Sequence, residues 1–114
     1  MTRILVADDN RQLVEMLRAM LEDAGYDVVT AGSGLAASAL LEKEEVDLLV
    51  LDVLMPGMSG DAVADLLRQS RPDLPVLLMT GDSGDQFVPE GSYPVLRKPF
   101  GEQELVEAVG RLVP

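Results

Sequence analysis

Short runs of large apolar residues recur along the chain, and most of them end at a polar residue. The clearest run is Leu48–Leu51, which is too short for a helix and too unbroken for a strand with one solvated face. It therefore predicts a strand that is covered on both faces, as in a parallel sheet. Similar runs predict four more strands, at residues 4–7, 27–31, 76–80 and 95–97.

Capping and turn residues between these runs predict the helices. Asn10 and Ser33 are the expected N-caps of the first two helices, and Gly25 ends the first one. Ser59 is the expected cap of a third helix, which ends before Pro72.

The spacing of apolar residues indicates which face of a helix packs on the sheet. The expected faces are Leu35, Ala36, Ala39 and Leu40 in the second helix, and Leu105, Val109 and Leu112 in a final helix after Gly101. The segment from Gly81 to Pro94 is rich in glycine and proline, so a fourth helix there is expected to be short or irregular.

Strands that alternate with helical segments predict the α/β class, with a doubly wound, five-stranded parallel sheet in one domain of residues 1–114. In such a sheet the ligand site lies at the carboxyl ends of the strands. The polar residues at those ends are Asp8, Asp9, Asp52, Thr80 and Lys98. Three carboxylates, one hydroxyl and one ammonium group are therefore expected to converge on one rim.

Composition narrows the chemistry that this rim can perform. The 114 residues include no Cys and no His, which excludes disulfides, thiol or imidazole catalysis and histidine metal ligands. The formal net charge of −11 argues against a nucleic-acid or anionic membrane surface and favours cations and basic partners. The apolar start is too short for a signal peptide and no run reaches membrane-spanning length, so a cytoplasmic location is predicted.

The three carboxylates predict a metal site. They would repel one another unless a cation lay among them, and their oxygens suit Mg²⁺, which leaves room for a phosphoryl oxygen. Asp52 would then be a nucleophile that accepts a phosphoryl group. Lys98 would neutralise charge on the phosphoryl oxygens, and Thr80 would donate a hydrogen bond to them.

Each of these residues also has an ordinary structural explanation. Asp52 could be a turn residue, and the acidic pair before the first helix could stabilise its positive N-terminus by about 0.3–1 kcal/mol. Thr80 could simply end a strand, and Lys98 could be solvated. Four separate structural explanations would all have to hold at once. A shared functional site explains more simply why each group lies at the same end of a different strand.

Together these residues resemble the receiver domains of two-component response regulators. The matching motifs are Asp8-Asp9, Asp52-Val53-Leu54-Met55-Pro56-Gly57-Met58-Ser59-Gly60, Thr80-Gly81 and Lys98-Pro99-Phe100. They follow in this order across nearly the whole chain, so the resemblance is specific. It implies a flavodoxin-like sheet with the strand order 2-1-3-4-5.

The resemblance implies that Asp52 takes a phosphoryl group from a phosphohistidine on a histidine kinase or histidine phosphotransfer protein. It implies a signalling domain that catalyses only the phosphorylation and dephosphorylation of its own aspartate. Asp9, Asp52 and the main-chain carbonyl of Leu54 would hold Mg²⁺, with Asp8 acting mainly through water. The Lys98–Pro99 peptide is expected to be cis. A weak or phosphorylation-dependent homodimer is consistent with the resemblance.

Two features depart from the family pattern. Family members usually carry Tyr or Phe three residues before the lysine, whereas this chain has Val95. The stretch between Thr80 and Lys98 is also shorter by about one helical turn, which resembles receivers attached to hybrid histidine kinases. We therefore predict that phosphorylation acts on residues 81–94, where Tyr93 is the aromatic residue nearest to the missing one.

Three other classes of protein fit the sequence less well. A pseudo-receiver that works without phosphate would be favoured if Asp9, Asp52 or Lys98 were missing. A flavin- or nucleotide-binding domain needs a glycine- or hydroxyl-rich loop after the first strand, where residues 7–11 offer carboxylates. A Mg²⁺-dependent phosphatase needs a capping insertion, for which the chain has no spare residues. No effector domain follows Pro114, so we expect a single-domain regulator or a piece of a longer protein.

Overall fold

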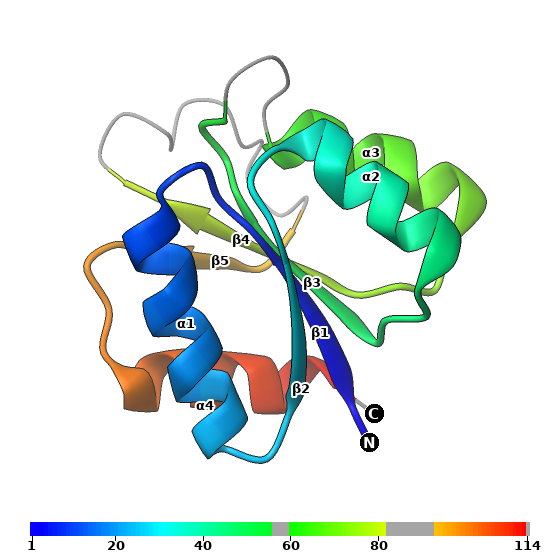
Figure 1. Ribbon diagram of the computed structural model, residues 1–114. Coiled ribbons are helices and arrows are strands. Elements are labelled where there is room, and N and C mark those ends of the chain that lie inside the picture. The colour runs from blue at the N-terminus through cyan, green and yellow to red at the C-terminus, as the bar shows by residue number, and fades with distance from the viewer. Residues whose placement is uncertain (56–59, 82–92, 114) are drawn as a thin grey trace.

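The segments predicted as strands form one parallel sheet with the order β2-β1-β3-β4-β5, as the resemblance implied (Figure 1). This computed structural model describes residues 1–55, 60–81 and 93–113. The strands are β1 Arg3–Ala7, β2 Asp27–Ala31, β3 Leu48–Asp52, β4 Val76–Thr80 and β5 Val95–Arg97. The helices are α1 Arg11–Asp23, α2 Gly34–Lys43, α3 Gly60–Ser70 and α4 Glu102–Leu112.

Helices cover both faces of the sheet, with α1 and α4 on one face and α2 and α3 on the other (Figure 1). Every residue of β3 is buried, as its unbroken apolar run predicted. Leu49 and Leu51 join the core on the α2/α3 side, whereas Leu48 and Val50 join the core on the α1/α4 side. Since burying one leucine contributes about 1.5–3 kcal/mol, packing on both faces holds β3 firmly and fixes the position of Asp52 at its end.

The predicted starts of α1 and α2 are confirmed. Asn10 Oδ1 accepts a hydrogen bond from the Leu13 amide at 3.2 Å, and Ser33 Oγ accepts one from the Ala36 amide at 3.1 Å. Each bond satisfies an amide that has no partner within its helix. Gly25 follows α1 with a φ of 97°, a left-handed conformation that favours glycine, so it ends the helix as predicted.

The predicted packing face of α2 was only partly right. The residues predicted to pack on the sheet were Leu35, Ala36, Ala39 and Leu40. Two of these are partly buried, but Leu35 is 79% exposed, and the fully buried residues are Gly34, Ala37 and Leu41. Apolar residues lie nearly all round this helix, so periodicity could not select a face. Gly34, Ala37 and Leu41 are three and four residues apart, so they lie on one face of the helix, and this face packs on the sheet.

The predicted face of α4 is confirmed. Leu105 and Val109 are buried, and Leu112 packs partly buried against the same cluster. Ser59 and the short fourth helix expected within residues 82–92 lie outside the described residues. No helix in the described part of the chain is long and apolar enough to cross a membrane.

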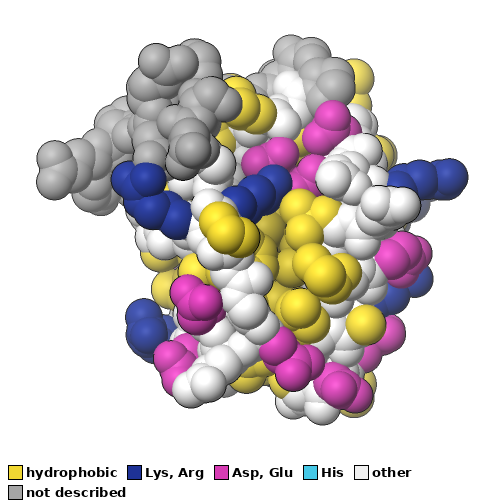
Figure 2. Space-filling model, turned by 90° about the vertical axis from the view of Figure 1, so that its left-hand side faces the viewer, with side chains coloured by type: hydrophobic (Ala, Val, Ile, Leu, Met, Phe, Trp, Pro, Cys, Tyr) yellow, Lys and Arg dark blue, Asp and Glu magenta, His cyan; other side chains and the backbone are white. Residues whose placement is uncertain are grey.

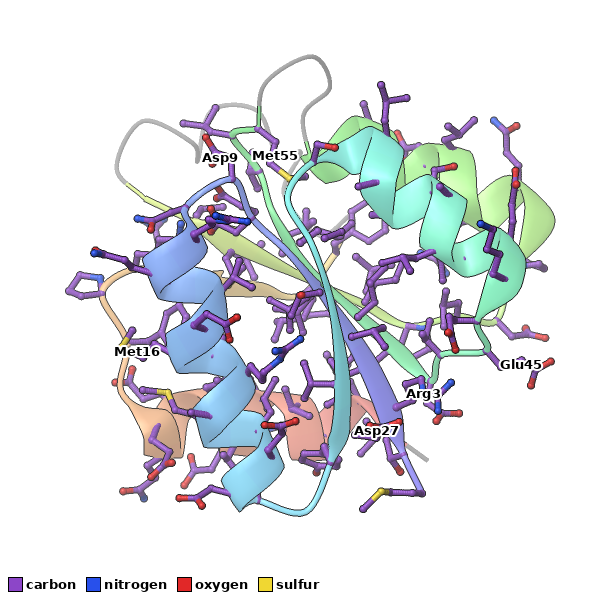
Figure 3. All side chains as sticks on the ribbon, viewed as in Figure 1. Arg3, Asp9, Met16, Asp27, Glu45 and Met55 are labelled. Carbon is purple, nitrogen blue, oxygen red and sulfur yellow. The ribbon has the colours of Figure 1, made fainter. Side chains whose placement is uncertain are left out.

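An ion-pair network joins the amino ends of the strands. Arg3 Nε lies 2.7 Å from Asp27 Oδ2, and Arg3 Nη1 lies 2.6 Å from Glu44 Oε2. The Arg3 amide donates a hydrogen bond to Asp47 Oδ2 at 2.8 Å. Figure 3 shows Arg3 and Asp27 together at this end of the sheet and Asp9 at the opposite end. The network therefore leaves the carboxyl ends of the strands free to build a site.

Candidate functional site

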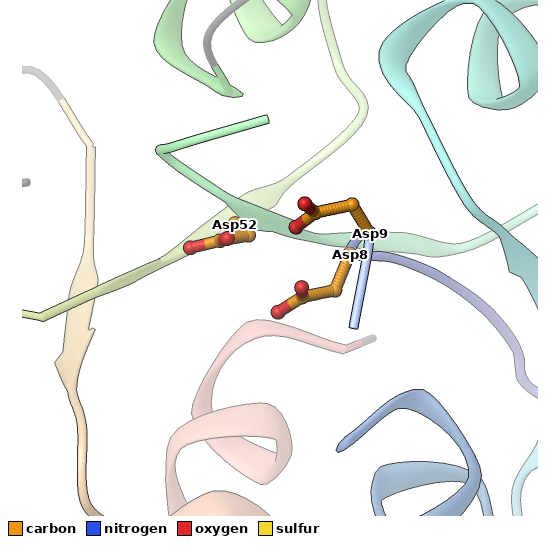
Figure 4. A group of neighbouring side chains, drawn as sticks. All are labelled: Asp8, Asp9 and Asp52. Carbon is orange, nitrogen blue, oxygen red and sulfur yellow. The ribbon is translucent and has the colours of Figure 1, made fainter. Parts of the chain in front are cut away.

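Three carboxylates meet at the carboxyl ends of β1 and β3 (Figure 4). Asp8 and Asp9 directly follow β1, and Asp52 is the last residue of β3. One oxygen atom from each of the three lies within 4.8 Å of the others. Asp8 and Asp52 are only 2% and 7% exposed, whereas Asp9 faces solvent. Parallel strand pairing thus brings together acidic residues that are far apart in the sequence.

Lys98 lies between two of these carboxylates. Its Nζ is 3.1 Å from Asp8 Oδ2 and 3.3 Å from Asp52 Oδ1. The Lys98 amide donates a hydrogen bond to the Thr80 carbonyl at 2.7 Å, which extends the pairing of β5 with β4 up to the rim. The Lys98–Pro99 peptide is cis, as predicted. A single ammonium group therefore partly offsets the charge of two buried carboxylates.

The surroundings of Asp52 disfavour its ionised form. Burial raises the pKa of Asp52 above the ordinary aspartate value, and the negative charge of Asp8 raises it further. Lys98 and the backbone amide of Leu54 lower the pKa, but they do not cancel the first two effects. An additional cation beside Asp52 would therefore be favourable.

We expect Asp52→Asn to make the metal-free protein more stable at neutral pH. Because the folded-state pKa is raised, ionising Asp52 removes stability as the pH rises from the ordinary value of 3.8 through the raised value. Asparagine has no charge to ionise, so the gain in the free energy of unfolding should appear across that window and persist at pH 7. Urea unfolding at several pH values, with a chelator present, measures this gain. A gain that does not depend on pH would contradict the assigned pKa.

Thr80 ends β4 at the same rim. Its side chain is 1% exposed, and Oγ1 has no hydrogen-bond partner among the described residues. A buried hydroxyl without a partner costs about 1–3 kcal/mol. The hydroxyl is therefore a donor that is ready for an acceptor brought into the site.

Replacing this hydroxyl should stabilise the fold. Thr80→Val keeps the shape of the side chain and removes the unpaired group, so the free energy of unfolding should rise by about 1 kcal/mol. Thr30→Val is the matched control, because Thr30 Oγ1 accepts a hydrogen bond from Arg18 Nη2 at 3.4 Å and its loss should bring no gain. Urea unfolding compares the two variants. Destabilisation by Thr80→Val would show that the hydroxyl already has a partner.

Comparison with known proteins agrees with this geometry. The family model of the response regulator receiver domain matches residues 4–110. The chain belongs to this family. The predicted phosphoacceptor signalling role of the domain is thereby confirmed.

Two curated relatives of this receiver domain are response regulators. The alkaline phosphatase synthesis transcriptional regulatory protein PhoP of Bacillus subtilis is 37% identical over 108 residues, which cover 90% of this chain and 45% of PhoP. The response regulator MprA of Mycobacterium avium is 39% identical over 115 residues, which cover 97% of this chain and 50% of MprA. The chain thus spans about half the length of these relatives.

Solved receiver structures share the fold. The chemotaxis response regulator CheY4 of Vibrio cholerae has a TM-score of 0.89 and 32% identity, with 99% of each chain covered. The response regulator TrrA of Thermotoga maritima, solved in complex with Mg(2+)-BeF, has a TM-score of 0.89 and 33% identity, with 99% of this chain and 100% of TrrA covered. The predicted fold class is confirmed.

The donor set of this receiver domain fits a divalent cation. Receiver domains use Mg²⁺ in an acidic pocket, and here three carboxylates face one ammonium group. Carboxylate oxygens are the ligands that Mg²⁺ prefers. The main-chain carbonyl of Leu54, two residues after Asp52, stays a predicted ligand.

One contact in the receiver site was missed from the sequence. The Asn10 amide donates a hydrogen bond to Asp8 Oδ1 at 2.9 Å, so Asp8 is held from its own loop as well as by Lys98. An aspartate that bonds the backbone two residues further on forms a common type of turn, and the Asp8-Asp9-Asn10 run carried that signal. Asn10 had been predicted only as a helix cap.

Proposed function

We propose that Asp52 is the residue of this receiver domain that accepts the phosphoryl group, with Lys98 and Thr80 binding the transferred group. The observation that carries the proposal is the placement of buried polar groups. Asp8, Asp52 and Thr80 are the buried polar or charged side chains of the described residues, and all three lie at this one rim. Burying these polar side chains at the rim does not stabilise the hydrophobic core, so a role in the signalling reaction is the better explanation. Phosphate incorporation into the protein and into Asp52→Asn tests it.

The donor in this proposal is the phosphohistidine of a histidine kinase or histidine phosphotransfer protein. A carboxylate oxygen of Asp52 attacks the phosphorus, an O–P bond forms and the N–P bond breaks. The electron pair of the broken bond returns to the imidazole nitrogen of the donor. Negative charge is spread over the phosphoryl oxygens, where Lys98 offsets it and the Thr80 hydroxyl donates a hydrogen bond.

Asp9, Asp52 and the Leu54 carbonyl would hold Mg²⁺ in this proposal, with Asp8 acting mainly through water. When bound, the ion offsets negative charge on the phosphoryl oxygens. Asp52 is nearly buried and sits beside a lysine, so its carboxylate is oriented before the donor arrives. The same groups would assist hydrolysis of the aspartyl phosphate, so the domain would act only on its own aspartate.

Millimolar Mg²⁺ should raise the melting temperature of the unmodified protein. An ion that binds only the folded state adds RT ln(1 + [L]/Kd) to stability, about 1.4 kcal/mol at ten times Kd. Asp9→Ala should lose this response, because Asp9 is a proposed ligand of the ion and the solvent-facing carboxylate of the cluster. Differential scanning calorimetry with and without Mg²⁺ measures the shift.

Asp23→Ala is the matched control for the Mg²⁺ experiment. Asp23 is an exposed carboxylate at the last position of α1, far along the helix from the rim, so this variant should keep the full shift. If Asp9→Ala responds like the unmodified protein, the effect is only screening of a chain with a net charge of −11.

A hydrophobic area on the α1/α4 side of the molecule suits a partner protein. Figure 2 shows the side of the molecule formed by α1 and α4, where hydrophobic side chains form a continuous area bordered by acidic ones. Met16 in α1 is 46% exposed, and Met20 and Val106 line a hollow of about 300 Å³ between the two helices. Exposed apolar patches often mark protein interaction sites. We place the kinase or phosphotransfer protein on this face.

The extent of the domain, its location, its partners and its output concern the whole protein and are proposals. PhoP is named a transcriptional regulatory protein, and the chain spans less than half of its length. We propose that the receiver domain occupies residues 1–114, is cytoplasmic and offers no surface to nucleic acid or anionic membranes, given its net charge of −11. Likeness to hybrid-kinase receivers and a weak or phosphorylation-dependent homodimer stay predictions. The presence of Asp9, Asp52 and Lys98 speaks against a pseudo-receiver.

A further inference from the structure

Tyr93 is fastened to α3 by two contacts. Its hydroxyl donates a hydrogen bond to Asp65 Oδ1 at 2.5 Å. The Arg68 guanidinium carbon lies 5.5 Å from the centre of the Tyr93 ring. Asp65 and Arg68 are three residues apart on the helix, so both project from the same side of α3. We call Tyr93, Asp65 and Arg68 the tyrosine clasp.

The surroundings of the ring agree with a formed clasp. Tyr93 is partly buried against the core cluster on the α2/α3 side of the sheet. Burial raises the pKa of the Tyr93 hydroxyl, and its hydrogen bond to the Asp65 carboxylate raises it further, while Arg68 acts in the opposite direction. The neutral hydroxyl is therefore the form that the clasp holds.

The clasp and the phosphorylation site hold opposite ends of β5. Tyr93 lies just before this strand, and the Pro94 carbonyl accepts a hydrogen bond from the Leu78 amide at 3.0 Å. Lys98 lies just after the strand and contacts Asp8 and Asp52. Four residues, Pro94 and the three of β5 (Val95–Arg97), separate Tyr93 from Lys98, and β5 is an edge strand of the sheet. Because β5 is short and held at both ends, a shift of Lys98 at one end displaces Tyr93 at the other.

Phosphorylation changes the attachment at the Lys98 end. Without phosphate, the Lys98 ammonium bridges two carboxylates. A phosphoryl group on Asp52 adds oxygens further from the β3 backbone, and the ammonium group is drawn towards them. Val95, the first residue of β5, is 40% exposed and carries no aromatic ring. Tyr93 is the aromatic residue that β5 connects directly to Lys98.

We infer that the tyrosine clasp is the conformational switch of this receiver domain: it holds the start of β5 against α3 in the unphosphorylated protein and opens when Asp52 is phosphorylated. The inference rests on the proposed function, because it needs a phosphoryl group beside Lys98. An open clasp frees the exposed Asp65 and Arg68 side chains on α3 for a partner. Phosphorylation is thereby read out on the α3 surface.

Tyrosine emission can report the clasp, because the chain has two tyrosines and no tryptophan. Tyr26→Phe leaves Tyr93 as the single emitter. A tyrosine hydroxyl bonded to a carboxylate emits weakly, since the carboxylate accepts its proton in the excited state. Adding Mg²⁺ and beryllofluoride, the mimic seen with TrrA, should raise the emission towards that of Tyr26→Phe/Asp65→Ala. Beryllofluoride binding should lower the ratio of closed to open clasp by at least about fivefold. This factor is the lower end of the usual range for allosteric coupling between two sites.

Thermodynamic linkage supplies a second measurement. If beryllofluoride opens the clasp, removing the clasp must strengthen beryllofluoride binding by the same factor. Tyr93→Phe removes one hydroxyl and keeps the ring, so its affinity for beryllofluoride with Mg²⁺ should rise about fivefold by calorimetry. Tyr26→Phe is the matched control and should bind like the unmodified protein, because Tyr26 lies just before β2, which is at the opposite edge of the sheet from β5.

The outcomes separate the switch from the proposed function. If Asp52 is phosphorylated normally and beryllofluoride binds, yet neither emission nor affinity changes, the clasp is not the switch and the proposed function stands. Weaker beryllofluoride binding to Tyr93→Phe would mean that the clasp persists in the phosphorylated state, which also overturns the inference. If Asp52 takes no phosphate at all, both proposals fail.

Discussion

Asp52→Asn should reduce phosphate incorporation to background. Asparagine lacks the nucleophilic carboxylate oxygen, and the neighbouring acids are not equivalent to it. Asp8 is held by the Asn10 amide and by Lys98, and Asp9 faces solvent, so neither combines burial with the strand-end position of Asp52. Incubation with acetyl phosphate or a cognate kinase and Mg²⁺, followed by assay of acid-stable, hydroxylamine-labile phosphate, measures the effect.

Asp73→Asn is the control for this loss, because Asp73 is an exposed carboxylate in the connection between α3 and β4, at the opposite end of the sheet. It should incorporate phosphate at the unmodified rate. Normal labelling of Asp52→Asn would assign the phosphoacceptor to another residue. Asp52→Asn is expected to be more stable than the unmodified protein, so lost labelling would not come from unfolding, and the same urea experiment checks this.

Lys98→Met should slow phosphorylation by roughly 10²–10³-fold, the usual effect of removing one preorganised group that stabilises transition-state charge. Methionine keeps most of the length of the side chain and removes its charge. Removing the ammonium group has two effects. The phosphoryl oxygens lose their ammonium partner, and Asp8 and Asp52 then face each other without the cation that now lies 3.1 and 3.3 Å away. Single-turnover labelling under saturating Mg²⁺ measures the rate.

Lys43→Met is the matched control, since Lys43 is exposed at the end of α2 and should label at the unmodified rate. Lys98→Arg should recover part of the rate, because it restores a positive charge with a different geometry. A Lys98→Met variant that labels at full speed would show that the lysine only balances the buried carboxylates. In that case its effect would appear in urea unfolding alone.

The sequence by itself determined the fold class and the composition of the site. The run Leu48–Leu51 needs apolar neighbours on both faces, and in a chain of this size only a sheet between two helical layers provides them. Once the sheet is parallel, polar residues that follow successive strands must meet at one edge. Asn10 and Ser33 were also readable as caps, because capping depends on a few adjacent residues.

Only the tertiary structure decided which groups pair across the fold. Lys98 contacts Asp8 across 90 residues of sequence, and Tyr93 bonds Asp65 across 28, and no local pattern encodes either partner. The α2 face was decided in the same way, because its apolar residues lie nearly all round the helix and only its packing on the sheet shows that Gly34, Ala37 and Leu41 are the buried ones. Thr80 was predicted from the sequence as a hydrogen-bond donor at the rim, but only the structure shows that its hydroxyl is buried without a partner among the described residues. Periodicity specifies which residues are buried on a regular element, whereas pairing between distant side chains depends on how the elements pack in three dimensions.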